Sequence, residues 1–309
     1  MRRIVLLGPQ RLKPTLVEAV DAVGVEGAVA AVTAGWQERE DEIDELSAHL
    51  RRPTVNLRLH QRGEDVFQRD PELFLAYGDL LDRKRKLQDL YRVRLAFEKD
   101  AVRALLASTT DADLLEPEVA SALDGVRELD RHHRERLTRI RAAFDAEWRP
   151  EARPVVAEHR EELAEVLAGC DALALAGGHV SVLLDRLRLF GVAELSGSMP
   201  VFAWSAGAMV AGEQVVLFHD SPPQGAGNAE ILDDGLGLCR GVLAFPHARR
   251  RLRTDDAVRV SLLARRFAPL RCLAMDDHAR VDFDAEGQPT VRLARELRPD
   301  GSVAEVVAP

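Results

Sequence analysis

Short apolar runs alternate with helical patterns over the first 60 residues. The runs at 4–8, 27–34 and 54–60 are long enough for strands, and the segments 13–23 and 37–50 between them have the spacing of amphipathic helices. Strands that alternate with helices favour a parallel sheet, because the chain must cross over before each new parallel strand. The start of the chain is therefore predicted to be an α/β unit.

The pattern changes at residue 70 to two long helical stretches. The sequence Asp-Pro-Glu at 70–72 is typical of a helix start, because a carboxylate caps the first turn and proline fits the first helical position. Apolar residues then recur at helical spacing to about residue 107, and a second such stretch runs from near Pro117 to Trp148. Two long helices joined by a short turn are expected to pack as an antiparallel hairpin.

This hairpin, residues 70–148, divides an α/β core domain of residues 1–69 and 149–309. Its outer faces are dense in charged residues, which fits either a solvated structural arm or an arm for dimerisation or partner binding. The hairpin has more apolar side chains than one narrow seam needs, among them Leu90, Tyr91, Phe97 and Phe144. We therefore expect a homodimer in which the arms contribute to the interface.

The α/β rhythm returns after residue 150. Further elements are expected as helices at 156–168, 180–190 and 255–267, and as strands at 171–178, 200–209 (running into a turn), 215–218 and 241–245. The last strands, at 273–277, 279–283 and 289–294, are short and alternate in polarity. They indicate an antiparallel edge or a small terminal sheet.

Composition narrows the class of protein. The chain has 309 residues, 46% of them hydrophobic, and a formal net charge of -9, which disfavours nucleic acid as a partner. No apolar stretch approaches the length of a membrane span, and the run Ile4–Leu7 is too short for a signal peptide. Cys170, Cys239 and Cys272 form no close pair, which indicates buried thiols in a reducing cytoplasm.

The strongest chemical signal is the sequence Ala-Trp-Ser-Ala-Gly at 203–207. A nucleophile elbow places its serine at a sharp turn between a strand and a helix, and the residues two before and two after it must be small because strand and helix approach closely. Ala203 and Gly207 meet that condition. Ser205 is therefore the candidate nucleophile, although many buried Ser-Ala-Gly turns have no catalytic role.

A glycine pair, Gly177-Gly178, ends the strand expected at 171–178. Loops at the carboxyl ends of parallel strands gather over one crevice, so this turn is expected beside the elbow. The amide of Gly178, together with that of Ala206, could bind an oxyanion. The alternative is a simple tight turn between a strand and a helix.

The candidate general base is His247, which follows the strand at 241–245 in the sequence Phe-Pro-His. A histidine at the end of a strand can take the proton of a serine hydroxyl. Other residues near strand ends stay open: His219 and His278 for the base, and Asp220, Glu230 and Asp277 for the acid that orients it.

Together these motifs resemble the S51 serine peptidases, which include dipeptidase E and the cyanophycinases, within the class I glutamine-amidotransferase-like fold. The resemblance covers roughly residues 171–283. The family's elbow, GWSAGA or GTSAGA, is AWSAGA here, and its glycine turn is similar to Ala176–His179. The sequence DDGLGL at 233–238 is similar to a cyanophycinase segment that also precedes a strand and the histidine, here His247.

The resemblance implies a three-layer α/β sandwich with a mostly parallel sheet. It implies that Asp220 orients His247, because dipeptidase E-like members have an acid at that place after the elbow. Residues implied in substrate binding are those of the glycine turn and of the arginine-rich segment after the histidine, namely Gly177, His179, Arg249 and Arg251. Two departures concern this site: Ala203 replaces the usual glycine, and His179-Val180 replaces a polar pair.

We therefore expect a serine hydrolase that cleaves a small peptide or isopeptide amide through an acyl-serine intermediate, without a metal or cofactor. The resemblance also implies a bond beside an aspartyl residue as one option. Arginines near His247 suit a substrate carboxylate close to that bond, because guanidinium is a planar two-pronged donor. The alternatives are a non-catalytic protein that binds a ligand or partner and an acyltransferase with the same nucleophile. Serine at the elbow argues against a glutamine amidotransferase, whose nucleophile is cysteine.

Overall fold

The computed structural model describes residues 2–219, 227–284 and 286–306. A seven-stranded sheet lies at its centre, in the order β11-β10-β1-β5-β4-β2-β3. Its strands are β1 (Ile4–Leu7), β2 (Val29–Val32), β3 (Thr54–Asn56), β4 (Ala172–Leu175), β5 (Val201–Trp204), β10 (Arg280–Phe283) and β11 (Pro289–Arg292). The first five in sequence run parallel, and β10 and β11 pair antiparallel at one edge. The predicted α/β fold with a mostly parallel sheet is confirmed.

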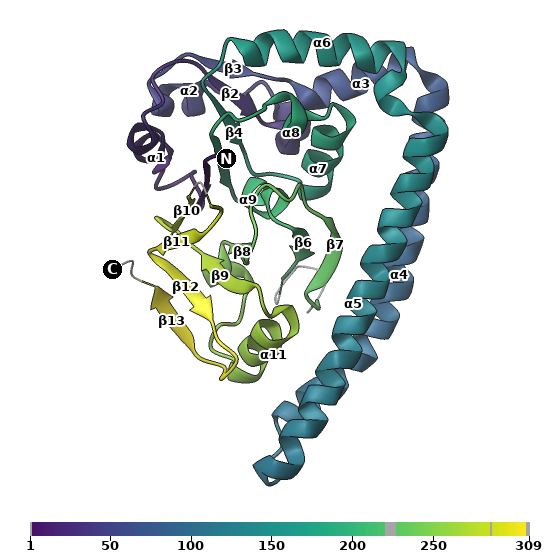
Figure 1. Ribbon diagram of the computed structural model, residues 1–309, viewed down its shortest axis with the longest axis vertical. Helices are drawn as coiled ribbons and strands as arrows, with labels where there is room; N and C mark the ends of the chain where they lie inside the picture. Colours follow the sequence, from purple (N-terminus) through teal and green to yellow (C-terminus); the bar gives the residue numbers. More distant parts are fainter. Residues whose placement is uncertain (1, 220–226, 285, 307–309) are drawn as a thin grey trace.

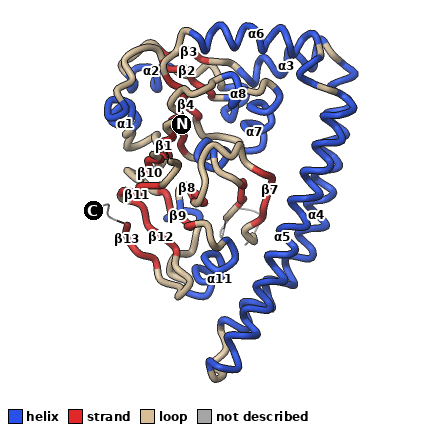
Figure 2. Tube along the Cα trace, viewed as in Figure 1, coloured by secondary structure: helices blue, strands red, loops and turns tan. Residues whose placement is uncertain are grey.

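Helices cover both faces of this sheet (Figures 1 and 2). Successive side chains of a strand point to opposite faces, so the continuous apolar runs predict burial on both sides. In β1, Val5 and Leu7 pack towards α1 (Leu16–Val23) and α2 (Asp44–Leu50), whereas Ile4 and Leu6 belong to the core on the other face. That second core includes side chains from α3 (Leu59–Arg69), α6 (Pro154–Ala168), α7 (Val180–Leu189), α8 (Val192–Leu195) and α9 (Ala206–Ala211).

The last third of the chain builds a second sheet beside the first. Its order is β13-β12-β9-β8, with β8 (Val242–Pro246), β9 (Arg271–Met275), β12 (Ala294–Leu297) and β13 (Val303–Val306). The helices α10 (Ala248–Arg251) and α11 (Ala257–Phe267) lie between β8 and β9 in sequence, and β6 (Gln214–Leu217) pairs with β7 (Glu230–Asp234) as a hairpin. The last strands thus supply both an antiparallel edge and a small terminal sheet.

Two predicted elements differ from the structure. The strand expected at 54–60 ends at Asn56 and is followed by α3, whose first turn donates backbone hydrogen bonds from His60 and Gln61 to the buried carboxylate of Glu40. The single helix expected at 37–50 is a 3-10 helix η1 (Ala34–Arg39) and then α2. The Glu40 carboxylate caps the start of α3 and so favours a helix where a strand was expected. Because Glu40 is distant in sequence from this helix start, the local spacing of residues cannot reveal the cap.

The predicted helical arm consists of α4 (Pro71–Leu106) and α5 (Ala112–Trp148), which pack side by side and project beyond the core (Figure 1). The Asp70 carboxylate caps α4 by accepting a hydrogen bond from Leu73, as the sequence predicts. The second helix starts before Pro117, because the backbone amides of Leu114 and Leu115 already bond to the carbonyl of Asp111.

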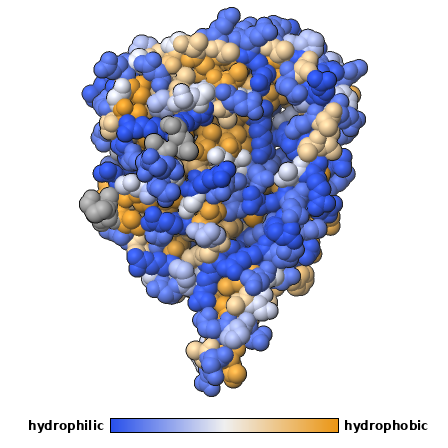
Figure 3. Space-filling model, in the orientation of Figure 1, coloured by the Kyte–Doolittle hydropathy of each residue, from blue (hydrophilic) through white to orange (hydrophobic). Residues whose placement is uncertain are grey.

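The apolar side chains of the arm divide into two sets. Tyr91 and Phe144 are buried within the chain, so they are not available to a partner. Leu90 and Phe97 are 62% and 75% exposed. Figure 3 shows that the visible face of the arm is largely hydrophilic, with small hydrophobic patches near its tip.

Charged residues connect the arm to the core. Arg266 of α11 is buried and donates to both carboxylate oxygens of Asp130 on α5 and to the hydroxyl of Tyr91 on α4, each at 2.7 Å. Lys84 on α4 and Arg188 on α7 pair with Asp233 of β7 at 2.7 and 3.0 Å. The arm is therefore fixed along the core over part of its length. No helix within the described ranges is both long and apolar enough to cross a membrane.

Candidate active site

Ser205 stands at a sharp turn between β5 and α9. Its backbone has φ 53° and ψ -122°, a region that a residue with a side chain rarely occupies. Gly207 must be small, because a Cβ there would lie 2.1 Å from the carbonyl oxygen of Leu175 in the neighbouring strand. Ala203 is completely buried. The local structure thus has the form of the predicted elbow.

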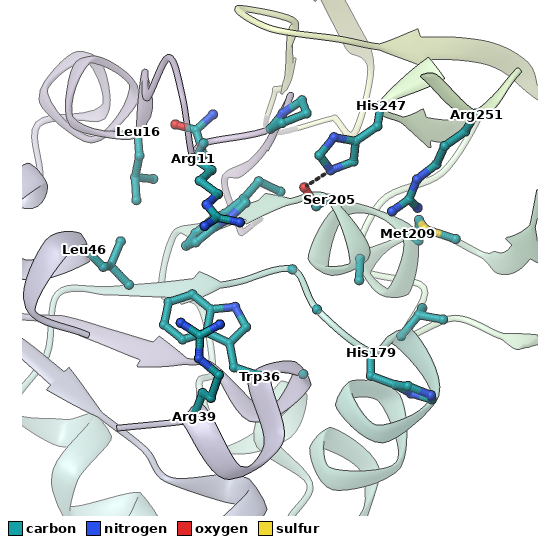
Figure 4. Close-up of a pocket in the computed structure, with 18 of the residues that line it drawn as sticks. Arg11, Leu16, Trp36, Arg39, Leu46, His179, Ser205, Met209, His247 and Arg251 are labelled. Atoms are coloured by element: carbon teal, nitrogen blue, oxygen red, sulfur yellow. Dashed lines mark hydrogen bonds between the residues drawn. The ribbon is translucent and has the colours of Figure 1, made fainter. Parts of the chain in front are cut away.

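His247 follows β8 and faces this elbow from the second sheet. Its Nε2 lies 3.1 Å from Ser205 Oγ, within hydrogen-bond distance (Figure 4). The two residues are 42 positions apart in sequence and come from strands of different sheets. The structure therefore brings together the predicted nucleophile and the predicted base.

The environment of His247 favours the neutral imidazole. Burial is the largest cause that lowers its pKa from the ordinary value of 6.5, and the positive charges of Arg251 and Arg250 lower it further. Asp276 and Asp277 oppose this shift. A neutral ring near pH 7 can accept the serine proton, which is what a general base requires.

The structure describes two of the three carboxylates that the sequence offers as the orienting acid, Glu230 and Asp277. Glu230 accepts hydrogen bonds from Arg92 and Gln88 of the arm, and Asp277 lies 3.7 Å from Lys13. In the described part of the chain, no carboxylate accepts a hydrogen bond from His247. Asp220, the expected acid, lies outside the described residues, so that assignment stays a prediction. Of the alternative bases, His219 lines the same pocket as His247, whereas His278 is exposed and outside it.

The glycine turn lies against the elbow as expected. A Cβ on Gly177 would be 2.8 Å from Ser205 Cβ and 3.6 Å from the amide nitrogen of Ala206. Gly178 has φ 109°, which only glycine adopts without strain. Neither Gly178 nor Ala206 donates its backbone amide to another described residue. Both amides are therefore available to a ligand at Ser205.

A pocket of about 830 Å³ opens around Ser205 and His247 (Figure 4). Arg251 and His179 line it, but the Nδ1 atom of His179 accepts a hydrogen bond from the amide of Val182 and so caps α7. Arg249 does not line the pocket: its side chain is 73% exposed and its Nε lies 3.8 Å from Asp276. Of the two predicted substrate arginines, only Arg251 reaches the site.

The structure adds residues that the sequence pattern did not single out. Arg11, Leu16, Trp36 and Leu46 form much of the wall opposite Arg251 (Figure 4). They come from the segment after β1, from α1, from η1 and from α2, all distant in sequence from the elbow. The one available signal was Gly35, which directly follows the apolar run at 27–34 and is unfavourable inside a helix.

Comparisons with known proteins place this site in a wider context. The model of peptidase family S51 matches residues 130–287, just over half of the chain, including Ser205 and His247. No curated protein matches the chain in sequence.

Solved structures similar to the chain include the following two. The crystal structure of a peptidase from an acI-B1 Actinobacterium has a TM-score of 0.51 and 11% identity, and the similarity covers 100% of this chain and 95% of that one. A peptidase E-type protein from Listeria monocytogenes EGD-e has a TM-score of 0.45 and 10% identity, over 94% of this chain and 98% of that one. At such identities the first similarity concerns the fold alone.

Proposed function

The chain belongs to peptidase family S51, and we propose that it is a serine hydrolase that cleaves an amide bond of a small peptide or isopeptide. Family membership supports a peptidase-type hydrolase. The observation that carries the serine mechanism is the 3.1 Å separation of Ser205 Oγ and His247 Nε2 at an elbow whose serine has a positive φ. A structural serine has no need of that conformation, and a strained serine beside a neutral imidazole suits nucleophilic attack.

The proposed reaction has two stages. Ser205 Oγ attacks the amide carbonyl while His247 Nε2 takes the hydroxyl proton, and the amides of Gly178 and Ala206 hold the oxyanion. His247 then gives the proton to the leaving nitrogen as the carbon–nitrogen bond breaks, which leaves an acyl-serine. A water molecule attacks this ester, His247 takes its proton and returns it to Ser205 Oγ, and the acid product leaves. Asp220 is proposed to orient the imidazole.

Arg251 supports a substrate with a free carboxylate near the scissile amide. It lines the pocket beside Ser205 and is partly buried, and burial lowers its pKa. It makes no ion pair with any described residue. A partly buried guanidinium without a counter-ion is well suited to hold a carboxylate of the substrate. An aspartyl residue beside the bond would supply one.

We also propose a homodimer that acts in the cytoplasm. The exposed apolar residues of the arm, Leu90 and Phe97, support the homodimer. The buried free thiols of Cys170, Cys239 and Cys272 are compatible with a reducing compartment.

The nucleophile is tested with a fluorophosphonate probe, which reacts with activated serines. We expect labelling at Ser205 of the wild-type protein and no labelling of Ser205→Ala or His247→Ala. Ser205→Ala should also fold normally and lose peptide hydrolysis by several orders of magnitude, as loss of a triad member does. Ser196, whose hydroxyl donates to a backbone carbonyl, provides the matched control Ser196→Ala, which should stay reactive.

Two outcomes would contradict the proposal. A wild-type protein that stays unlabelled would favour the non-catalytic alternative. Hydrolysis by Ser205→Ala at the wild-type rate would exclude the acyl-serine mechanism. Analysis of products with an added amine would separate hydrolysis from acyl transfer, since both use the same nucleophile.

A further inference from the structure

The pocket extends to both sides of Ser205. Arg251 lies on one side, and Arg11, Trp36 and Leu46 lie on the other (Figure 4). Its volume of about 830 Å³ lies towards the upper end of the roughly 300–1,000 Å³ typical of small-ligand sites. An amide bond at Ser205 therefore leaves room for a substituent on the side away from Arg251.

We define the outer compartment as the part of the pocket lined by Arg11, Leu16, Trp36, Leu46 and His49. Leu16 opens α1, and Leu46 and His49 belong to α2. The Nε2 atom of His49 accepts a hydrogen bond from the backbone of α1, and burial is the largest cause that lowers its pKa. With a neutral imidazole, two leucines and an indole, the wall of this compartment is largely apolar.

Trp36 is held in the compartment by a fixed loop. The hydroxyl of Thr33 and the amide of Asn56 both donate to the carbonyl of Glu40, at 3.0 and 2.8 Å. Directly after Trp36, Gln37 has φ 56° and ψ -122°, an unfavourable conformation for a residue with a side chain. The fold therefore maintains backbone strain next to an indole that is only partly buried. Strain of this kind concentrates at ligand sites.

The charged residues at the rim of the compartment are of both signs, namely Arg11, Arg39, Glu42 and Glu45. Arg39 also lines the pocket, but it is bound to Glu42 at 2.9 Å, which offsets its charge. Arg11 makes no ion pair with a described residue. Its loop is held by Gln10, whose side chain accepts a hydrogen bond from the amide of Thr15 at 2.7 Å. Among the described residues, Arg11 is therefore a guanidinium at this rim that no carboxylate pairs with, Glu45 included.

We propose that the outer compartment binds the substituent of the scissile amide that points away from Arg251, and that it selects an apolar side chain next to a free carboxylate. Trp36, Leu16 and Leu46 contact the apolar side chain, and Arg11 binds the carboxylate. The proposal rests on the proposed hydrolase function, since it takes Ser205 as the position of the bond. Two kinds of substrate offer this chemistry from opposite sides of the amide. In one, a C-terminal apolar residue supplies both the side chain and the carboxylate. In the other, an apolar residue carries an N-acyl group that ends in a carboxylate.

The test measures binding to the full-length Ser205→Ala variant by calorimetric titration. One peptide set has an acidic residue followed by leucine or alanine, with a free or an amidated C-terminus. The other set has leucine or alanine before the acidic residue, with an N-succinyl or an N-acetyl group. In one set we expect leucine to bind about tenfold more tightly than alanine, from burial of apolar surface. In the same set the carboxylate should give a further gain of about threefold to tenfold over its neutral counterpart.

Two further changes separate the two contacts. Adding Trp36→Ala to Ser205→Ala should remove the preference for leucine, and adding Arg11→Gln should remove the preference for the carboxylate. Lys13→Gln is the matched control, since Lys13 is a cation in the same loop that pairs with Asp277 and does not line the pocket. It should leave both preferences unchanged.

The proposal is overturned if neither peptide set binds, if leucine and alanine or carboxylate and neutral peptides bind equally, or if Lys13→Gln acts like Arg11→Gln. These outcomes are distinct from failure of the hydrolase proposal. Binding is measured without turnover, whereas reactivity of Ser205 towards the fluorophosphonate needs no peptide.

Discussion

The charge of His247 controls the proposed chemistry, because only the neutral imidazole can take the serine proton. Its pKa is lowered from 6.5, first by burial and then by Arg251 and Arg250. We therefore expect kcat/KM to rise with pH, with a midpoint below 6.5, and to level off above it. The measurement is a pH–rate profile on any peptide that the protein cleaves.

Two exposed neighbours should move this midpoint in opposite directions. Arg250→Gln removes a positive charge that lowers the pKa of His247, so the midpoint should shift to higher pH. Asp277→Asn removes a negative charge that raises it, so the midpoint should shift to lower pH. Shifts in the same direction, or a rate that falls as pH rises through this range, would exclude His247 as the base.

At the scale of residues, the sequence predicted that Ser205 stands at a sharp turn and that His247 follows a strand. Both predictions were possible because an elbow and a histidine after a strand are local patterns. It did not predict Trp36 or Arg11, since their approach to Ser205 depends on how separate loops meet. Arg249 and Arg251 could not be distinguished from composition. They are two positions apart on α10, so their side chains point in different directions.

Among the elements, the arm helices α4 and α5 were predictable from spacing and from the cap at Asp70. Their packing against the core was not, because it depends on charged residues that look solvated in sequence. Asp130 and Arg266 are 136 positions apart in sequence and lie on different helices, yet they form a buried pair. Periodicity alone assigns such residues to the surface.

The buried pair at Asp130 should contribute strongly to stability. Asp130→Asn leaves the buried guanidinium of Arg266 without its counter-ion, so we expect a loss of about 3–5 kcal/mol in the free energy of unfolding. Glu128→Gln, two positions away on the same helix, breaks an exposed pair with Arg131 and should change stability little. Denaturant titrations of the two variants provide the measurement. Equal, small losses would mean that the arm is not anchored through Arg266.

For the whole molecule, the arm offers an exposed apolar face to a partner. Leu90, Val93 and Phe97 are exposed on α4 at intervals of three and four residues, so they lie on one helical face. We expect a dimer at micromolar concentration by size-exclusion chromatography with light scattering. Leu90→Glu with Phe97→Glu should convert it to a monomer, whereas Arg85→Glu on another part of α4 should not. A monomeric wild-type protein would leave the arm as a structural element.

The contact between Ser205 and His247 also joins two sheets that fold from different parts of the chain. Ser205 follows β5 of the seven-stranded sheet and His247 follows β8 of the four-stranded sheet, so the 3.1 Å contact measures how the two sheets are docked. A small slip between them would break the contact while each sheet stays intact. In low denaturant, activity should therefore disappear before the circular dichroism of helices and strands changes, since local openings need less free energy than global unfolding. Coincident transitions would mean that the two sheets separate only when the whole chain unfolds. If activity is lost first, catalysis reports a shift between the two sheets that bulk spectroscopy does not detect.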